Sequence, residues 1–354
     1  MQVYYHSDAD GKCSAYIVKA ELCNVFDKPL PEDFYMYSYT GGIGNIIKND
    51  ETVYIVDLSL NDVIYYLIYR LISNGCKVIH IDHHKTTLDY LDSCTPKQLT
   101  TMNSVTKFYK VGISGCLLTW IYSCMNDTER ENPMSVSFDF AEGRSHVKII
   151  DSNNDAREYR IPMAIRYIDD YDVWRHDIEE SNYFIMAYNM LGDNSPSSLI
   201  WDDLIYGSDF NLKQYVDNGR LIYDYQMSVN KDILKNAFEV EFAEFGTVLC
   251  LNSIYGNSKI FGDKFDEYVA VCKFGYDGTH DKWVYSMYAS EVFNKDNDVD
   301  LTPIAKFFEG GGHNHACGWT LSFNIFDRRS NVPYNHEPFI TDMQKIDWGS
   351  YDEY

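Results

Sequence analysis

Val78-Ile79-His80-Ile81-Asp82-His83-His84 is a short, mainly apolar run that ends in one carboxyl and two imidazole groups. The same pattern occurs twice more: Val3-Tyr4-Tyr5 precedes His6-Ser7-Asp8-Ala9-Asp10-Gly11, and Val53-Tyr54-Ile55-Val56 precedes Asp57. Short apolar runs bounded by polar residues are typical of strands that are buried on both faces. The sequence therefore predicts three buried strands near the N-terminus, each followed by acidic or imidazole side chains.

The segments between these runs have helical spacing. Residues 12–22 place Ala15, Ile17, Val18 and Leu22 on one side of a helix, and residues 61–73 form a second helix that ends at Asn74-Gly75. Residues 34–39 read as a further strand. Alternation of strands and helices predicts a parallel sheet covered on both faces, in which ligands bind beyond the carboxyl ends of the strands. The three polar clusters are therefore expected to meet in one crevice.

The rest of the chain predicts a second, smaller domain. Residues 113–123 and 162–167 read as helical, residues 136–159 as a charged hairpin or insertion without an assigned role, and residues 212–238 as a long helix between domains. Alternating apolar residues predict strands over 239–245, 246–251, 268–274, 283–288 and 318–323, with a helix over 301–308. We expect an α/β protein with an N-terminal parallel-sheet domain (1–195), a helical linker (196–238), a smaller α/β domain (239–330) and a tail (331–354).

Charge and cysteine usage restrict the function. The 354 residues carry a formal net charge of −23, and lysine and arginine form no cluster. A long nucleic-acid track needs clustered cations, so a nucleic-acid substrate is expected to be short. Nine scattered cysteines without a C-x-x-C pair argue against a zinc ribbon and indicate a reducing cytoplasm. No signal peptide and no apolar run of about 18 residues occurs, so we expect a cytoplasmic protein without a membrane segment.

The three polar clusters together predict a binuclear metal site. Singly, Asp8 to Gly11 could be a turn, Asp57 a helix cap, and His83-His84 a surface pair. Two divalent ions about 3.5–4 Å apart can hold a bridging hydroxide and clamp an attacked phosphoryl group. Such a site needs several carboxylates, one of them bridging, together with neutral imidazoles. Ligation by histidine and aspartate without cysteine favours Mn²⁺, with Mg²⁺ or Co²⁺ as alternatives.

These motifs resemble those of the DHH phosphoesterase family. Asp82-His83-His84 is similar to the family's signature triplet, His6-x-Asp8-x-Asp10-Gly11 to its first motif, and Asp57-Leu58-Ser59 to its second. Gly310-Gly311-Gly312-His313 resembles the glycine-rich motif of the associated C-terminal domain. That variant accompanies nucleases, nanoRNases and dinucleotide phosphodiesterases rather than family II pyrophosphatases. The resemblance covers about residues 3 to 325.

The resemblance implies a role for each motif residue. His6 and Asp8 would hold the first metal, Asp10 and His83 the second, and Asp57 would bridge both. His84 would contact the phosphate or organise the attacking water, and Asp82 would orient a metal-binding imidazole. The family's fourth motif is an aspartate with an apolar or aromatic residue four places on. Asp170, followed by Trp174, fits that spacing as a ligand of the second metal, and Asp172 is the alternative.

The glycine motif has two interpretations. Gly310 alone could end a helix. Three successive glycines also allow backbone N–H groups to approach a phosphate, which predicts substrate binding by Gly311, Gly312 and His313, assisted by His315.

The resemblance implies a manganese-dependent phosphodiesterase that cleaves short oligonucleotides or linear dinucleotides to mononucleotides. Alternatives are a phosphohydrolase of cyclic dinucleotides or other small phosphorylated metabolites, a RecJ-like single-strand exonuclease, and an inactive binding scaffold. The expected partner is the short substrate, with no membrane and no long nucleic-acid track. The oligomeric state is left open, with a homodimer as one option.

Overall fold

The computed structural model describes residues 1–23, 31–37, 49–141, 143–151, 153–242, 246–290, 292 and 299–326. The chain divides into two compact units, residues 1–223 and 224–354. The division falls inside the long helix α10 (Asp209–Leu234), within the segment predicted as a linker. The predicted tail lies outside the described residues, as do the last residues of the predicted strands 34–39 and 239–245.

The first unit is built on a five-stranded parallel sheet, as the sequence predicted. Its strands lie in the order β2-β1-β3-β4-β5, and every neighbouring pair is parallel. The strands are β1 (Gln2–His6), β2 (Phe34–Tyr37), β3 (Thr52–Val56), β4 (Lys77–Asp82) and β5 (Thr106–Tyr109). Strands β2 and β5 lie at the two edges, so the three polar clusters follow the three inner strands β1, β3 and β4.

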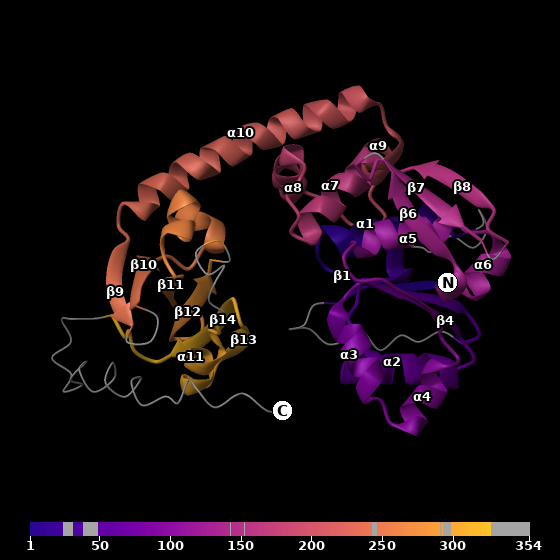
Figure 1. The fold of residues 1–354 in the computed structure, drawn as a ribbon, viewed down its shortest axis with the longest axis horizontal. Coiled ribbons are helices and arrows are strands. Elements are labelled where there is room, and N and C mark those ends of the chain that lie inside the picture. Colours follow the sequence, from indigo (N-terminus) through magenta and orange to yellow (C-terminus); the bar gives the residue numbers. More distant parts are fainter. Residues whose placement is uncertain are drawn as a thin grey trace. The chain divides into compact units, whose positions relative to one another are not determined.

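Helices cover both faces of this sheet. Alternate strand residues enter two separate apolar clusters: Val3 and Tyr5 pack on one face, and Tyr4 packs on the other. The first cluster includes buried residues of α1 (Ala9–Glu21), α5 (Gly115–Ser123) and α7 (Met163–Asp172), and the second includes those of α2 (Asp62–Ser73). In Figure 1, α2 and α4 (Pro96–Met102) lie on one side of β4, and α1 and α5 lie on the other.

Two predicted segments differ from the structure. The helix expected from residue 12 begins at Ala9, because the side chain of Asp8 caps it by accepting a hydrogen bond from Gly11 N. The expected hairpin at 136–159 is a three-stranded antiparallel sheet of β6 (Ser137–Ala141), β7 (His146–Ile150) and β8 (Ala156–Arg160). Its central strand buries Val147 and Ile149 in the core of the first unit, so this segment is part of the domain.

The structure also contains helices that the sequence analysis did not predict. They are α3 (Lys85–Ser93), α4, α6 (Asp127–Glu131), α8 (Glu179–Asn189) and α9 (Ile200–Tyr206). No helix in the described part of the chain is long and apolar enough to cross a membrane.

The second unit contains a six-stranded mixed sheet in the order β13-β14-β12-β11-β10-β9. Its strands are β9 (Phe238–Phe242), β10 (Gly246–Asn252), β11 (Ala270–Asp277), β12 (Lys282–Ala289), β13 (Gly311–His313) and β14 (Ala316–Leu321). Helix α11 (Thr302–Phe307) packs on one face, in a cluster with Cys272, Phe274 and Trp319. The predicted smaller α/β domain is confirmed in class, and the glycine motif forms the edge strand β13.

Candidate metal centre

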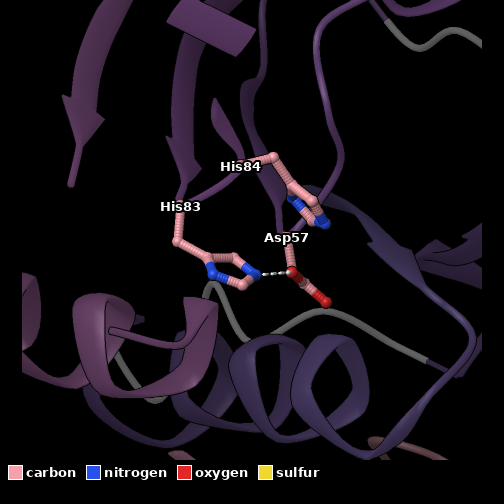
Figure 2. A group of neighbouring side chains, drawn as sticks. All are labelled: Asp57, His83 and His84. Carbon is pink, nitrogen blue, oxygen red and sulfur yellow. Dashed lines mark hydrogen bonds and ion pairs between the residues drawn. The ribbon is translucent and has the colours of Figure 1, made fainter. Parts of the chain in front are cut away.

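The polar clusters meet at the carboxyl edge of the parallel sheet. The ring of His83 lies at their centre: its Nε2 is 3.1 Å from Asp57 Oδ1, 3.6 Å from Asp10 Oδ2 and 3.5 Å from Asp172 Oδ2. Figure 2 shows the ring of His83 directed at Asp57, and the ring of His84 lies beside both, with its centroid 4.4 Å from that of His83. One imidazole is therefore surrounded by carboxylates from three separate parts of the chain.

The carboxylate of Asp10 is fixed by the start of helix α5. Its Oδ2 accepts a hydrogen bond from Gly115 N and its Oδ1 from Cys116 N, both at 2.7 Å. A helix N-terminus favours negative charge, so this contact holds the buried carboxyl group of Asp10 in place. Gly115 has no alternative here, because a Cβ atom would lie 2.8 Å from Asp57 Cβ and 3.0 Å from Asp10 Oδ2.

Asp57 has the features of a metal ligand. It follows β3 in the left-handed region, with φ of 54°, and its side chain is 1% exposed. Its Oδ2 is buried without a hydrogen-bond partner among the described residues. Burial and the neighbouring carboxylates of Asp10 and Asp8 raise the pKa of Asp57 well above its usual value. A bound cation would offset both the burial and the repulsion.

His6 and Asp8 form the opposite side of the cluster. His6 Nδ1 lies 2.7 Å from Asp8 Oδ2 and 3.9 Å from Asp57 Oδ2. Burial raises the pKa of Asp8, but the hydrogen bond and charge of His6 outweigh burial and leave that pKa below its usual value.

Asp82 fixes the ring of His84. Its Oδ1 lies 2.8 Å from His84 Nδ1, and its Oδ2 accepts a hydrogen bond from the Thr87 hydroxyl. Asp82 is 1% exposed and makes no ion pair with His83 among the described contacts. This geometry suits the expected orienting role, with His84 as the imidazole that is oriented.

The structure places the two candidates of the fourth motif in different surroundings. Asp170, the preferred candidate, points away from the cluster: its carboxylate accepts hydrogen bonds from Asp177 N at 2.9 Å, Ile178 N at 3.2 Å and Ser181 Oγ at 2.8 Å. Asp172, the alternative, lies beside His83, and burial together with Asp10 and Asp8 raises its pKa to about 9. The spacing to Trp174 does not show which face of α7 meets the other clusters, so both assignments of the fourth motif stay predictions, and the geometry favours Asp172.

The donor set suits divalent cations. Three groups of side chains each bring ligand atoms within 4.8 Å of one another: His6, Asp8 and Asp57; Asp10, His83 and Asp172; and Asp57, His83 and His84. Asp57 and His83 each belong to two groups, as a pair of neighbouring ion positions requires. Oxygen and imidazole donors without a thiolate suit Mn²⁺ and related ions.

A cavity of about 280 Å³ lies beside this cluster, within the first unit. Asp8, Asp10 and Asp172 line one part, and Lys12, Trp174 and Asn194 line another. Lys12 Nζ donates to Asn194 Oδ1 at 2.8 Å. The Trp174 ring is edge-to-face with Tyr171 and is 56% exposed, and its backbone is left-handed with φ of 59°. An aromatic ring of this size in that conformation indicates a locally strained turn that presents the ring.

Gly115, Lys12 and Asn194 were not predicted from the sequence as parts of the site, and Trp174 entered only through the spacing of the fourth motif. Residues 113–123 were predicted only as a helix, and the N-cap Ser114 at its start also marks backbone N–H groups able to bind a carboxylate. Nothing local to Asn194 indicates its contact with Lys12, which is 182 residues away.

The glycine motif lies in the second unit. Helix α11 ends at Phe307, and the left-handed residue after its C-cap is Glu309, with φ of 57°, rather than Gly310, whose N–H donates to Ala305 O at 2.7 Å. Gly312 has φ of 143° and packs against β14, whereas a Cβ on Gly311 would meet no atom within 4 Å. Ala289 N donates to the backbone carbonyl of His315 at 3.0 Å. Substrate binding by Gly311, Gly312, His313 and His315 remains a prediction.

No family model matches the chain. An uncharacterized protein of Acanthamoeba polyphaga mimivirus is 22% identical over 270 residues, which are 73% of this chain and 51% of that protein. The chain thus spans about half the length of this curated relative.

Solved structures give looser matches. A DHH domain, from a protein described as a member of a family of ribosomal proteins, matches with a TM-score of 0.49 and 15% identity, covering 89% of this chain and 81% of that one. The pGpG-specific phosphodiesterase PggH from Vibrio cholerae matches with a TM-score of 0.49 and 11% identity over 98% of both chains. An exopolyphosphatase-related protein from Bacteroides fragilis has a TM-score of 0.41 and 13% identity, covering 97% and 92%. The first three motifs, which resemble those of the DHH phosphoesterases in sequence, gather in one cluster at the sheet edge.

Proposed function

We propose that this protein is a metal-dependent phosphodiesterase that hydrolyses short oligonucleotides or linear dinucleotides to mononucleotides. The observation that carries the proposal is the position of His83, with carboxylates of Asp10, Asp57 and Asp172 within 3.6 Å of its Nε2. Three carboxylates around one imidazole repel one another, and bound cations would neutralise that repulsion.

Two divalent ions, with Mn²⁺ preferred, would be held at neighbouring positions. His6 and Asp8 would hold one ion, Asp10, His83 and Asp172 the other, and Asp57 both. When bound, such a pair polarises a phosphoryl group and supplies a nucleophile at neutral pH. Rigid placement comes from the chain itself, since Asp57 and Asp82 are carried by strand ends and Asp10 is anchored on α5.

His84 would bind a phosphoryl oxygen of the substrate. Burial lowers the pKa of His84, but the hydrogen bond and charge of Asp82 more than compensate and raise it above its usual value. Because Nδ1 is bonded to Asp82, the other ring nitrogen, Nε2, can donate to an anionic group in the cluster. A protonated His84 would stabilise negative charge as it develops on the phosphoryl group.

The cavity beside the cluster favours a substrate that carries a base over polyphosphate. Trp174 offers an exposed aromatic face on which a base can stack, and Lys12 with Asn194 can bind polar groups on its edge. Small-ligand pockets usually measure about 300–1,000 Å³, so a cavity of about 280 Å³ suits one base or sugar. The net charge of −23 and the absence of a basic cluster in the sequence favour short substrates over long strands.

The test is hydrolysis of a linear dinucleotide, a forty-residue single strand, a cyclic dinucleotide and tripolyphosphate by the full chain with Mn²⁺, resolved by product chromatography. We expect mononucleotides from the linear dinucleotide and lower kcat/KM on the other substrates. Asp57→Asn should lower kcat by more than about a hundredfold while circular dichroism stays unchanged. A faster reaction on the forty-mer would replace the proposal by a single-strand exonuclease. Fewer than two ions at saturating Mn²⁺, together with no cleavage, would indicate a binding scaffold.

A further inference from the structure

The second unit buries a lysine without an acidic partner. Lys273 in β11 is 8% exposed, and its Nζ makes one hydrogen bond, to Ile254 O at 3.3 Å. No carboxylate in the described part of the chain forms an ion pair with it. Burial lowers the pKa of Lys273 below its usual value. Lysine is rarely buried unless it is paired, because its charge loses hydration, so this position calls for an anion.

Lys273 lines a cavity of about 320 Å³ on its face of the sheet, together with Ser253, Ile254, Val284, Ser286 and Asp277. One wall is fixed by the backbone: Ser253 N donates to Phe274 O at 2.7 Å, and a Cβ on Gly275 would lie 2.1 Å from Ile254 Cγ2. Only glycine allows this approach, so the wall is a constant part of the sheet.

The chemistry of the lining suits a phosphate. Ser253 and Ser286 bring hydroxyl groups next to one ammonium. The Ser253 hydroxyl donates to Tyr255 O at 3.1 Å, and a hydroxyl can rotate to donate to a phosphate oxygen instead. Asp277 lies four residues along the strand from Lys273, a distance of about 13 Å. Its carboxylate accepts hydrogen bonds from Thr279 N at 2.9 Å and from His280, whose Nδ1 lies 2.7 Å away. The carboxylate of Asp277 therefore has donors of its own, and the ammonium of Lys273, which donates one N–H to Ile254 O, has two N–H groups left for an anion.

The same face leads to the glycine strand. Lys273 is paired with Ser286 in β12, Ser286 with Gly318 in β14, and Gly318 with Gly311 in β13. Paired residues of antiparallel strands share a face, so these four form one row across the sheet. The row spans about 14 Å from Lys273 to Gly311 and carries only small residues after the lysine. Gly311 is exposed at its far end, with no atom within 4 Å of the Cβ position.

We propose that Lys273 is the cation of a second anion site, in which the pocket of Lys273, Ser253 and Ser286 binds a phosphomonoester group. The row of small residues lets the rest of a nucleotide lie flat on the sheet toward Gly311. We further assign the bound phosphate to the terminal phosphate of the substrate, and this assignment rests on the proposed function. Binding of a phosphate dianion by the pocket is independent of the proposed function.

The first experiment measures binding of inorganic phosphate to the full chain in EDTA, by calorimetry and ³¹P NMR, so that the metal centre does not contribute. Wild-type protein should bind phosphate, and Lys273→Met should weaken binding at least tenfold. Lys282→Met is the matched control, because Lys282 is exposed on the neighbouring strand β12 and should bind as wild type does. Absence of binding to wild type, or unchanged binding to Lys273→Met, would overturn the site. If Lys273→Met does not fold, Ser286→Leu decides, since a filled pocket that still binds phosphate contradicts the proposal.

The second experiment identifies the source of the phosphate. With Mn²⁺, wild-type protein should have at least a fivefold lower KM for a dinucleotide with a terminal phosphate than for the same dinucleotide without one. Lys273→Met should lose this difference. Equal KM values for wild type, together with binding of inorganic phosphate, would assign the pocket to free phosphate and reject the substrate assignment. If neither dinucleotide is cleaved, the proposed function fails, and the phosphate titration still decides the pocket.

Discussion

Asp170 and Asp172 lie two residues apart on α7, and their carboxylates serve different parts of the molecule. Asp170 accepts hydrogen bonds from Ser181 Oγ and from two backbone N–H groups, whereas Asp172 lies 3.5 Å from His83 Nε2. On a helix of 3.6 residues per turn, two residues are separated by about 200° around the axis, so the two side chains leave opposite faces.

Exchange of these aspartates for asparagine should therefore separate stability from metal binding. Asp170→Asn should lower the free energy of unfolding by about 1.5–3 kcal/mol, because a buried carboxylate loses charge-assisted hydrogen bonds. Asp172→Asn should leave the metal-free protein as stable as wild type or more stable, while weakening Mn²⁺ binding. Urea unfolding in EDTA and Mn²⁺ calorimetry measure the two effects. Strong loss of Mn²⁺ affinity in a folded Asp170→Asn variant would restore Asp170 as a ligand.

Metal-free protein should lose stability as the pH rises. The folded-state pKa of Asp172 is raised from 3.8 to about 9, so between these values the folded state binds more protons than the unfolded state. The free energy of unfolding therefore falls with pH over this range. Mn²⁺ should raise Tm more at pH 8 than at pH 5, because binding requires deprotonated carboxylates. Melting curves in EDTA and in Mn²⁺ check this. In EDTA, Tm of the Asp172→Asn variant should depend less on pH than Tm of the wild type. An EDTA series whose Tm rises from pH 5 to 8 would contradict the argument.

Trp174 should contribute to binding of the substrate base. Trp174→Ala should raise KM for a linear dinucleotide by an amount that corresponds to about 1–3 kcal/mol, the usual value of one base stacked on an aromatic ring. Trp174→Phe should recover most of the loss. An abasic dinucleotide is the control, since its KM should respond little to either substitution. Equal effects of Trp174→Ala on both substrates would indicate a structural role instead.

The glycines of the second unit should differ in their tolerance of alanine. Gly312→Ala should destabilise the protein by about 1–3 kcal/mol, because φ is 143° and the new Cβ would lie 2.5 Å from Ala316 O. Gly311→Ala should leave the unfolding curve unchanged, since the Cβ would meet open space. If Gly311 lies against the substrate, Gly311→Ala should raise KM while the unfolding curve stays unchanged. Urea curves and steady-state kinetics on both variants test this contrast.

The parallel sheet and the first three motifs could be predicted from local sequence. Val53 to Val56 is a run of apolar and aromatic residues, and Val78 to Ile81 is interrupted only by His80; such runs are typical of strands buried on both faces. Since parallel strands share a carboxyl edge, convergence of Asp10, Asp57 and His83 followed from the fold class alone.

Prediction failed where spacing in the sequence does not define direction in space. Asp169-Asp170-Tyr171-Asp172 contains three carboxylates of the same type, and only the packing of α7 decides which one meets His83. The contact of Lys12 with Asn194 and that of Asp10 with the start of α5 join residues more than a hundred positions apart.

The sequence by itself thus determined the strands β1, β3 and β4, their polar ends and the chemical types of the ligands, because these depend on local patterns of burial and turn formation. Only the tertiary structure decided that Asp172 joins the cluster, that Asp170 supports the turn before α8, and that Lys273 lies buried in a row with Ser286 and Gly311. The physical reason is that side-chain direction depends on how helices and strands pack, and packing depends on the whole chain.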